Sequence, residues 1–241
     1  MRYKLVFSYD GAPYEGYQIQ KDKLTVAKVL NEAISKVLKV EINVTASGRT
    51  DSGVSAIAQV GHFDYDGDLP RNFVGHVNHE LPSTIKICCV EAKPDFHARY
   101  DAKSKTYSYK FYVSDVANAY YDKFAYHVYN CDVKKMEDAT KYLIGTHDFS
   151  SFCATGTAVK DKVRTITSAT IIGDGNLYTF KITGNGFLYN MVRIIVGTLV
   201  QIGTTDLPAM HMRYIINTRD RKNAGPTLPA SPLVLESVDY S

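Results

Sequence analysis

The chain has 241 residues, of which 45% are hydrophobic and 22% are charged, and its net charge is +3. This balance is typical of a globular protein with a core of its own, and it excludes the disordered and disulfide-dependent classes. The length allows one large domain or two compact ones of about 100 residues each. The weakly basic total permits a polyanionic partner but does not by itself argue for one.

Targeting signals and metal motifs are missing from the sequence. The first residues enter a strand pattern directly and lack the apolar core of a signal peptide. The longest apolar stretch, 191–202, is interrupted by Arg193, Gly197 and Gln201, so we expect no membrane association. The cysteines form no CxxC pair and have no histidine at zinc-finger spacing, which predicts reduced structural thiols, no metal and a cytoplasmic location. They are Cys88, Cys89, Cys131 and Cys153.

The first half of the chain alternates between strand and helix patterns. Apolar residues at every second position predict a strand over 3–9. Thr25 is expected to cap a helix that ends at Leu38, whose apolar positions follow the i, i+3, i+4, i+7 spacing of a buried face. The other predicted elements are a strand beginning at Ile42, a strand over 59–65, a short helix over 73–81 and a strand over 84–91.

The second half repeats that order. A strict alternation predicts a strand over 106–113 with Tyr107, Tyr109 and Phe111 on one face. Asp132 is expected to cap a helix that buries Ile144 and stops at Gly145. The remaining predicted elements are strands over 163–172 and 178–183 joined by the turn 173–176, a helix over 188–202, a short helix from Pro208 and a last strand over 233–240.

Each half therefore reads as strand, helix, two strands, helix, strand. This order predicts an α+β fold with two ferredoxin-like (RRM-like) units, 1–103 and 104–241, whose antiparallel sheets join side by side. The helices are expected to cover one face of each sheet and to leave the other face free. An exposed sheet face with tyrosines beside basic patches suits RNA, whereas the alternative is that the tyrosines pack against one another. The basic patches span 99–110 and 213–222.

The strongest local signal for chemistry is the loop 47–54, Ser-Gly-Arg-Thr-Asp-Ser-Gly-Val. Its glycines allow backbone conformations that bring the chain close to a ligand. Arg49 stands two residues before Asp51, where its charge favours the ionised carboxylate and hence a lowered pKa. An ionised carboxylate presented on a loop after a strand is a candidate nucleophile. An aspartate in a glycine-flanked turn also commonly serves only as a turn residue, and the loop by itself leaves both interpretations open.

Residues 48–54 resemble the GRTDAGV loop of the tRNA pseudouridine synthase A family, whose aspartate is catalytic. Further stretches resemble the family in the same order, and together they cover essentially the whole chain. They are 9–20 (YDGAPYEGYQIQ), 96–99 (FHAR) followed by 105–109 (KTYSY), 145–152 (GTHDFSSF), 184–193 (GNGFLYNMVR) and 224–227 (AGPT). The resemblance implies conversion of uridine to pseudouridine at positions 38, 39 and 40 in the anticodon stem-loop of tRNAs, by a homodimer without cofactor.

Carried over to this sequence, the resemblance assigns three catalytic-site residues. Asp51 is the nucleophile, Tyr107 stacks on the target uracil and is a candidate base for its C5 proton, and Arg193 pairs with the aspartate. Asp51 comes from the first half and its partners from the second, so we expect an active-site cleft between the two units. A glycosidase needs a second carboxylate to activate water, but here water must be kept out and one suffices. Attack at C1′ and attack at C6 of the uracil remain alternatives.

The competing hypothesis is a non-catalytic RNA-binding or RNA-folding protein on the same scaffold. Loss of Asp51 or of its arginine partner would be its signature, and both are present. Three positions depart from the family pattern: Tyr17 stands where tryptophan is usual, Ser55 where histidine is usual and Pro232 in place of a glycine. These departures bear on the positioning of RNA more than on chemistry. His76 and His79 lie three residues apart but lack further ligands, which argues against a metal site.

Overall fold

The computed structural model describes residues 1–157 and 159–241, and these form two compact units. Unit 1 comprises residues 1–103 together with 234–241, and unit 2 comprises residues 104–233. The last strand thus groups with the first unit, although the sequence division placed it with the second half. Within the described residues, no helix has both the length and the apolar character needed to cross a membrane.

Unit 1 is an α+β layer structure built on one sheet. The strand order is β4-β1-β3-β10, with β2 paired to β3. Strand β1 runs antiparallel to both of its neighbours, and β10 pairs parallel to β3 through Val234 and Ser55. The elements are β1 (Arg2–Tyr9), α1 (Val26–Leu38), β2 (Thr45–Ala46), β3 (Ser55–Asp64), α2 (Phe73–Glu80), β4 (Ile85–Ala92) and, from the end of the chain, β10 (Leu233–Asp239).

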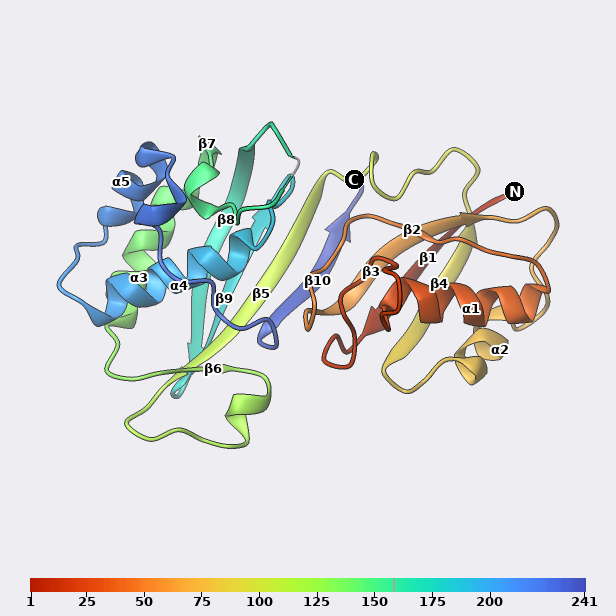
Figure 1. Cartoon of the computed structure of the whole chain (residues 1–241), viewed down its shortest axis with the longest axis horizontal. Coiled ribbons are helices and arrows are strands. Elements are labelled where there is room, and N and C mark those ends of the chain that lie inside the picture. The colour runs from red at the N-terminus through yellow and green to blue at the C-terminus, as the bar shows by residue number, and fades with distance from the viewer. Residues whose placement is uncertain (158) are drawn as a thin grey trace. The chain divides into compact units, whose positions relative to one another are not determined.

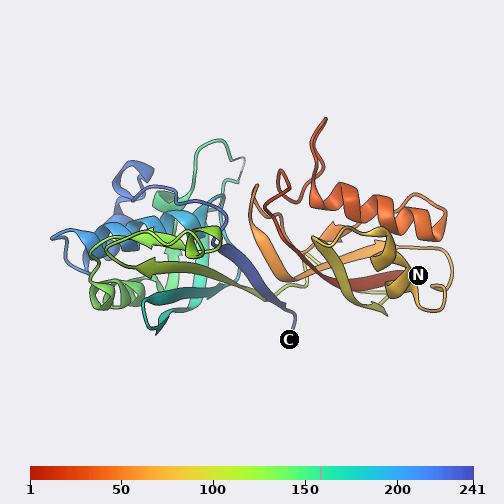
Figure 2. The same ribbon diagram turned by 90° about the horizontal axis from the view of Figure 1, so that it is seen from below.

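Helix α1 forms where the sequence predicts it. Its first turn is capped by Thr25, whose hydroxyl accepts a hydrogen bond from the Lys28 amide, and it ends before Lys39, which adopts the left-handed conformation. The predicted apolar face is buried at Leu30 and Ile34. Helix α1 lies over the sheet and packs beside α2 (Figures 1 and 2), above the alternating buried side chains of β1.

The strand predicted to begin at Ile42 is shorter in the structure. Only Thr45–Ala46 pair with β3, whereas Ile42 and Val44 are buried outside any strand. Side chains of α1 satisfy the backbone here, because Ser35 Oγ accepts from the Ile42 amide at 2.8 Å and Asn31 Oδ1 accepts from the Val44 amide at 3.0 Å. The backbone of residues 42–44 is therefore hydrogen-bonded to side chains of α1 and not to a strand of the sheet.

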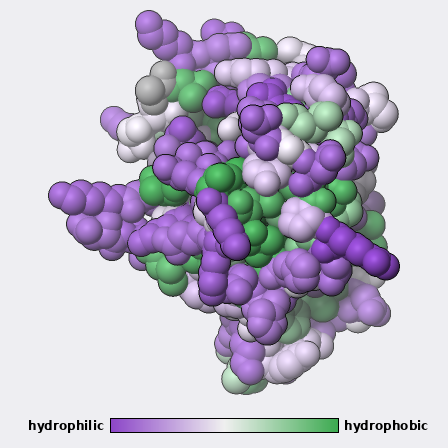
Figure 3. Space-filling view, turned by 90° about the vertical axis from the view of Figure 1, so that its right-hand side faces the viewer, coloured by the Kyte–Doolittle hydropathy of each residue, from purple (hydrophilic) through white to green (hydrophobic). Residues whose placement is uncertain are grey.

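The face of the sheet opposite α1 is also covered, contrary to the expected free face. Val6 and Val60 are cross-strand neighbours on that face. Phe96 and Ala98 from the chain after β4, together with Tyr240, pack against them in a second small core. Figure 3 shows unit 1 presenting mainly hydrophilic side chains, with apolar ones gathered near the middle of that view. Unit 1 is thus a sheet with packed side chains on both faces.

Unit 2 has the sheet order β5-β9-β8-β7, with β6 parallel to β5. Helices α3, α4 and α5 pack on one another and on this sheet (Figure 1). The elements are β5 (Ser104–Val113), η1 (Tyr121–Lys123), β6 (Tyr126–Val128), α3 (Val133–Thr140), η2 (Lys141–Leu143), β7 (Gly145–Asp148), η3 (Ser150–Phe152), β8 (Val163–Asp174), β9 (Leu177–Gly184), α4 (Met191–Thr204), α5 (His211–Thr218) and η4 (Arg221–Asn223).

Two expectations for unit 2 are wrong in detail. The sheet face opposite the helices was expected to be free, but strand β5 is buried on both faces. Tyr112 packs against Tyr121 and stacks on His127, and both of these residues come from the chain that follows the strand. Helix α3 has the predicted Asp132 cap but ends at Thr140, and Ile144 is exposed. Short strands such as β6 and β7 carry too few residues to show a period in the sequence.

Candidate active site

Asp51 lies in unit 1 on the loop between β2 and β3, and its side chain is half-buried. The loop closes on itself at this point, since the Val54 amide donates to the Asp51 carbonyl at 3.1 Å. Gly53 has a φ of 79°, a left-handed conformation that favours glycine. The turn therefore presents the Asp51 side chain at the end of a tightly folded loop.

A second loop, residues 10–17, holds the aspartate loop in place. The Tyr17 amide donates to the Thr50 carbonyl at 3.1 Å, and the Gly53 amide donates to the Tyr14 carbonyl at 3.3 Å. Gly16 has a φ of 84°, and a Cβ there would lie 2.9 Å from the Thr50 carbonyl oxygen. The two loops pack backbone to backbone, so the position of Asp51 depends on both. They belong to the two N-terminal stretches on which the family resemblance rests.

Gln59 organises the base of the aspartate loop, and sequence reasoning missed it. Its side chain is fully buried; it accepts from Ser47 Oγ at 2.7 Å and donates to the Gly48 carbonyl at 3.1 Å. The Tyr9 hydroxyl lies within 3.5 Å of Gln59 Nε2 and 2.8 Å from Thr50 Oγ1. Burial raises the pKa of Tyr9 to about 12, which keeps this hydroxyl neutral. A glutamine at an inward position of a strand is the one sequence signal for this role.

Tyr107 lies in unit 2 on β5, opposite Ile182 of β9. Its ring is almost completely buried and meets Phe187 edge to face, with the ring centroids 5.1 Å apart. Such edge-to-face contacts fix the orientation of an aromatic ring. Tyr107 belongs to the family stretch 105–109 and Phe187 to the stretch 184–193. A residue of one stretch therefore fixes the aromatic ring of the other.

Arg193 lies in the first turn of α4 in unit 2 and is half-buried. Its Nε donates to the Leu228 carbonyl at 2.6 Å, and its Nη1 donates to Asn190 Oδ1 at 2.8 Å. Two donors fixed in this way set the plane of the guanidinium group. Arg193 also acts electrostatically on Tyr109, two residues along β5 from Tyr107. Tyr107 and Arg193 are therefore both positioned by packing inside unit 2.

The chain after α5 positions Arg193, a contribution that the sequence did not reveal. Besides the Leu228 carbonyl, the Gly225 amide donates to Thr198 Oγ1 of α4 at 2.9 Å. The Pro229 carbonyl accepts from the Tyr109 hydroxyl at 3.0 Å. The segment 224–230 thus connects α4 with β5 around the arginine.

Comparison with known proteins identifies the family. The model of the tRNA pseudouridine synthase family matches residues 5–101 and 139–241. The chain belongs to the tRNA pseudouridine synthase family. Enzymes of this family are isomerases that convert uridine to pseudouridine.

Several curated relatives match over nearly the full length. Proteins named tRNA pseudouridine synthase A are 45% identical in Shouchella clausii, over 97% of this chain and 91% of that protein, and 42% identical in Geobacillus kaustophilus, over 99% and 94%. In Bacillus licheniformis the identity is 43% over 100% of this chain and 99% of the relative. Among solved structures, a Cbf5-Nop10-Gar1 complex gives a TM-score of 0.40 at 14% identity, covering 83% of this chain and 45% of that one.

The three departures from the usual family pattern have structural roles. Tyr17 is buried and donates from its hydroxyl to the Val44 carbonyl at 3.3 Å, while burial raises its pKa. Ser55 Oγ accepts from the Gly11 amide at 3.0 Å and so joins the loop 10–17 to the start of β3. The Pro232 carbonyl accepts from the Lys110 amide of β5 at 3.3 Å.

The remaining candidate residues are placed as follows. Arg49 is exposed on the aspartate loop, and its pairing with Asp51 stays a prediction. His76 and His79 lie on α2. Across residues 1–157 and 159–241, no three histidine, cysteine or acidic side chains are grouped closely enough to hold a metal ion.

Proposed function

We propose that this chain isomerises uridine to pseudouridine in tRNA, at positions 38, 39 and 40 of the anticodon stem-loop, with Asp51 as the nucleophile. The observation that carries the proposal is the aspartate loop: a half-buried carboxylate on a turn that is fastened by Gln59 and by the loop 10–17. Catalytic side chains need a rigid backbone around them, because small displacements of the reacting atoms slow a reaction strongly. Membership of the tRNA pseudouridine synthase family supplies the substrate class.

The reaction exchanges one bond of the nucleoside for another. The N1–C1′ bond breaks, the uracil turns while it stays bound, the C5–C1′ bond forms, the C5 proton is lost to a base and N1 takes up a proton. In the proposal Asp51 attacks C1′ or C6 and leaves again when the C-glycoside is complete, so that product and substrate are isomers. Tyr107 stacks on the uracil and takes the C5 proton, and Arg193 stabilises the charge of the Asp51 carboxylate.

The proposal also includes the architecture around the target uridine. Two ferredoxin-like units, one carrying Asp51 and the other carrying Tyr107 and Arg193, contribute to a single site. The sheet orders β4-β1-β3 and β5-β9-β8 and the helices packed on each sheet support this view of the units. Arg49, exposed on the aspartate loop, contacts the RNA backbone as a phosphate ligand or holds Asp51 ionised.

We further propose a cytoplasmic homodimer that works without metal or cofactor. The cytoplasmic location rests on the four cysteines, all of which are free thiols. The homodimer rests on the family resemblance, and sedimentation of the purified chain with and without tRNA tests it. Addition of a chelator should leave the activity unchanged.

The deciding experiment is tritium release from tRNA labelled at uracil C5. We expect release by the wild-type chain and none by Asp51→Asn, because the amide cannot act as the nucleophile. Asp66→Asn removes an exposed carboxylate elsewhere in unit 1 and serves as the matched control, with wild-type release expected. Equal release by wild type and Asp51→Asn would remove Asp51 from the mechanism. Tight tRNA binding by the wild type with no release would favour the non-catalytic RNA-binding alternative.

A further inference from the structure

Tyr100 is an aromatic side chain whose exposure the proposed chemistry does not explain. It follows the 96–99 stretch in unit 1 and is 76% exposed. Large aromatic rings contribute most to stability when they are buried, so a ring this exposed adds little to the core. Its neighbours Phe96 and Ala98 are buried, which shows that the surrounding chain is packed while Tyr100 points outward.

The ring of Tyr100 is nevertheless held in place on one side. It stacks on His97 with a centroid distance of 4.1 Å and an interplanar angle of 30°. His97 Nδ1 accepts from the amides of Arg99 and Tyr100, each at 3.2 Å, so the imidazole is tied to the backbone that carries the tyrosine. The His97 amide in turn donates to Asp101 Oδ2 at 2.8 Å. These bonds close a small, rigid turn around the stacked pair.

The turn is anchored to the sheet below it. The rings of His97 and His62, a residue of β3, lie 4.7 Å apart, and His62 Nδ1 accepts from the Ala98 amide at 3.1 Å. The Ala98 carbonyl accepts from the Tyr240 hydroxyl at 2.7 Å. Tyr100 therefore has one supported face on His97 and leaves the rest of its surface to solvent. An aromatic ring in this state loses little conformational freedom when a ligand stacks on it.

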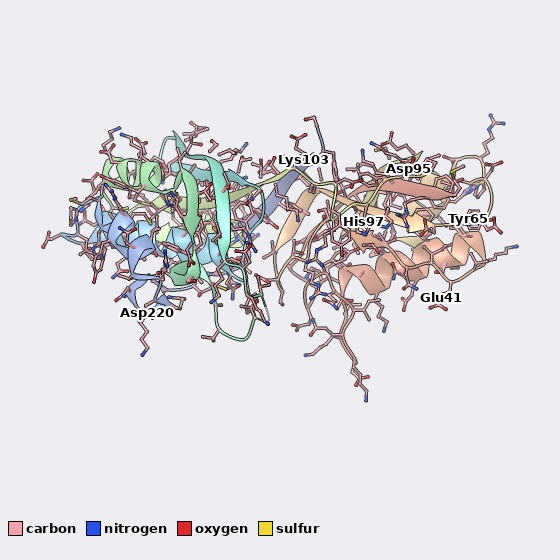
Figure 4. All side chains as sticks on the ribbon, turned by 90° about the horizontal axis from the view of Figure 1, so that it is seen from above. Glu41, Tyr65, Asp95, His97, Lys103 and Asp220 are labelled. Atoms are coloured by element: carbon pink, nitrogen blue, oxygen red, sulfur yellow. The ribbon has the colours of Figure 1, made fainter. Side chains whose placement is uncertain are left out.

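The charges beside Tyr100 favour a negatively charged partner. Arg99 and Lys103 are exposed on the part of the chain that follows β4. Figure 4 labels His97 and Lys103 in this part of the chain. Asp101, which accepts the His97 amide, is the one carboxylate over residues 99–110, and it stands against the cations Arg99, Lys103, Lys105 and Lys110. A supported aromatic ring close in the chain to exposed cations is the combination with which proteins bind unpaired bases, since the ring stacks on the base and the cations contact its phosphates.

We propose that Tyr100 is a stacking platform for an unpaired base of the RNA substrate, with Arg99 and Lys103 contacting the adjacent phosphates. Tyr100 is then a positioning residue, which binds RNA and takes no part in bond exchange. This inference rests on the proposed function for the identity of the RNA. The platform needs the aromatic ring and not the hydroxyl group, because a base stacks on the π-face.

The absence of tryptophan from the sequence gives a direct probe. Tyr100→Trp introduces the only tryptophan of the chain at the platform, and we expect an unmodified tRNA transcript to quench the tryptophan emission by stacking. Tyr129→Trp places the same fluorophore at a tyrosine of unit 2 that is 64% exposed, and we expect no quenching there. A blunt RNA duplex of the same length has no unpaired base and should leave both variants unquenched. Unchanged Tyr100→Trp emission on saturation with the tRNA transcript would overturn the proposal.

Steady-state kinetics of tritium release provide the second test. Tyr100→Ala and Tyr100→Leu should raise KM for tRNA roughly 5- to 150-fold with kcat unchanged, the range expected for losing one base stack. Tyr100→Phe should restore the wild-type KM, and the thermal midpoints of all three should match the wild type. An unchanged KM in Tyr100→Ala would refute the platform, whereas tritium release by the wild type would still support the proposed function. If the proposed function is wrong, the wild type releases no tritium. In that case the fluorescence test with the tRNA transcript still decides whether Tyr100 is a stacking platform.

Discussion

Replacing Gly197 by alanine reverses the sign that helix propensity assigns to such a change. Gly197 lies in the middle of α4, where alanine is favoured over glycine by about 1 kcal/mol. In the structure a Cβ at Gly197 would lie 1.9 Å from the Pro226 carbonyl oxygen, a backbone atom of the segment 224–230. Real Cβ contacts are essentially never shorter than 3.0 Å, so this segment must move away from the helix by about 1 Å.

The displacement breaks two hydrogen bonds that the segment makes with α4. The Gly225 amide bonds Thr198 Oγ1, and the Leu228 carbonyl accepts from Arg193 Nε. A buried neutral bond and a bond to a charged group are worth about 1–3 kcal/mol each. After the propensity gain of about 1 kcal/mol is subtracted, we expect Gly197→Ala to lower the free energy of unfolding by about 1–5 kcal/mol. Activity should fall as well, since the same shift releases the guanidinium group of Arg193.

The assay is urea unfolding followed by circular dichroism, with Gly203→Ala as the matched control. Gly203 lies in the same helix, but the atoms nearest to its added Cβ belong to side chains, Cys131 Sγ at 2.7 Å and Met136 Cγ at 2.8 Å. Methionine adapts to small changes in the space around it, so we expect the control to stay within about 1 kcal/mol of the wild type. Equal stability of the two variants would refute the reasoning, because the contact with Pro226 is what distinguishes them.

Two further predictions concern residues that the sequence did not single out. Burial lowers the pKa of His62 to about 4, with smaller contributions from Arg2 and His97. As the pH falls, the imidazole of His62 is therefore protonated in the unfolded chain before it is protonated in the folded one. Stability should therefore be full above about pH 6.5 and fall by about 2–3 kcal/mol as the pH drops toward 4; a His62→Gln variant with the same pH profile as the wild type would contradict this. Gln59→Leu removes the bonds to Ser47 and Gly48, and we expect about a 10- to 100-fold loss of kcat from the loosened aspartate loop, measured by tritium release. A wild-type kcat in Gln59→Leu would show that the loop holds its position without this side chain.

The sequence by itself determined most of the local elements and named candidate residues for the chemistry. The periodicity of 26–38 and the hydroxyl of Thr25 specify α1, because burial of one helix face and capping depend on near neighbours. The family to which the chain belongs was also evident from short stretches spread along both halves. Asp51, Tyr107 and Arg193 were named from those stretches, and their roles remain proposals.

Tertiary structure decided which side chains hold these residues in place. Gln59 supports the aspartate loop, and the segment 224–230 holds Arg193, through contacts between residues far apart in the chain. The same holds for the second core formed by Phe96 and Tyr240 on the face of unit 1 that we expected to be free. Periodicity records only whether a side chain is buried and not what covers it. Long-range packing of this kind therefore appears only when the folded chain brings the partners together.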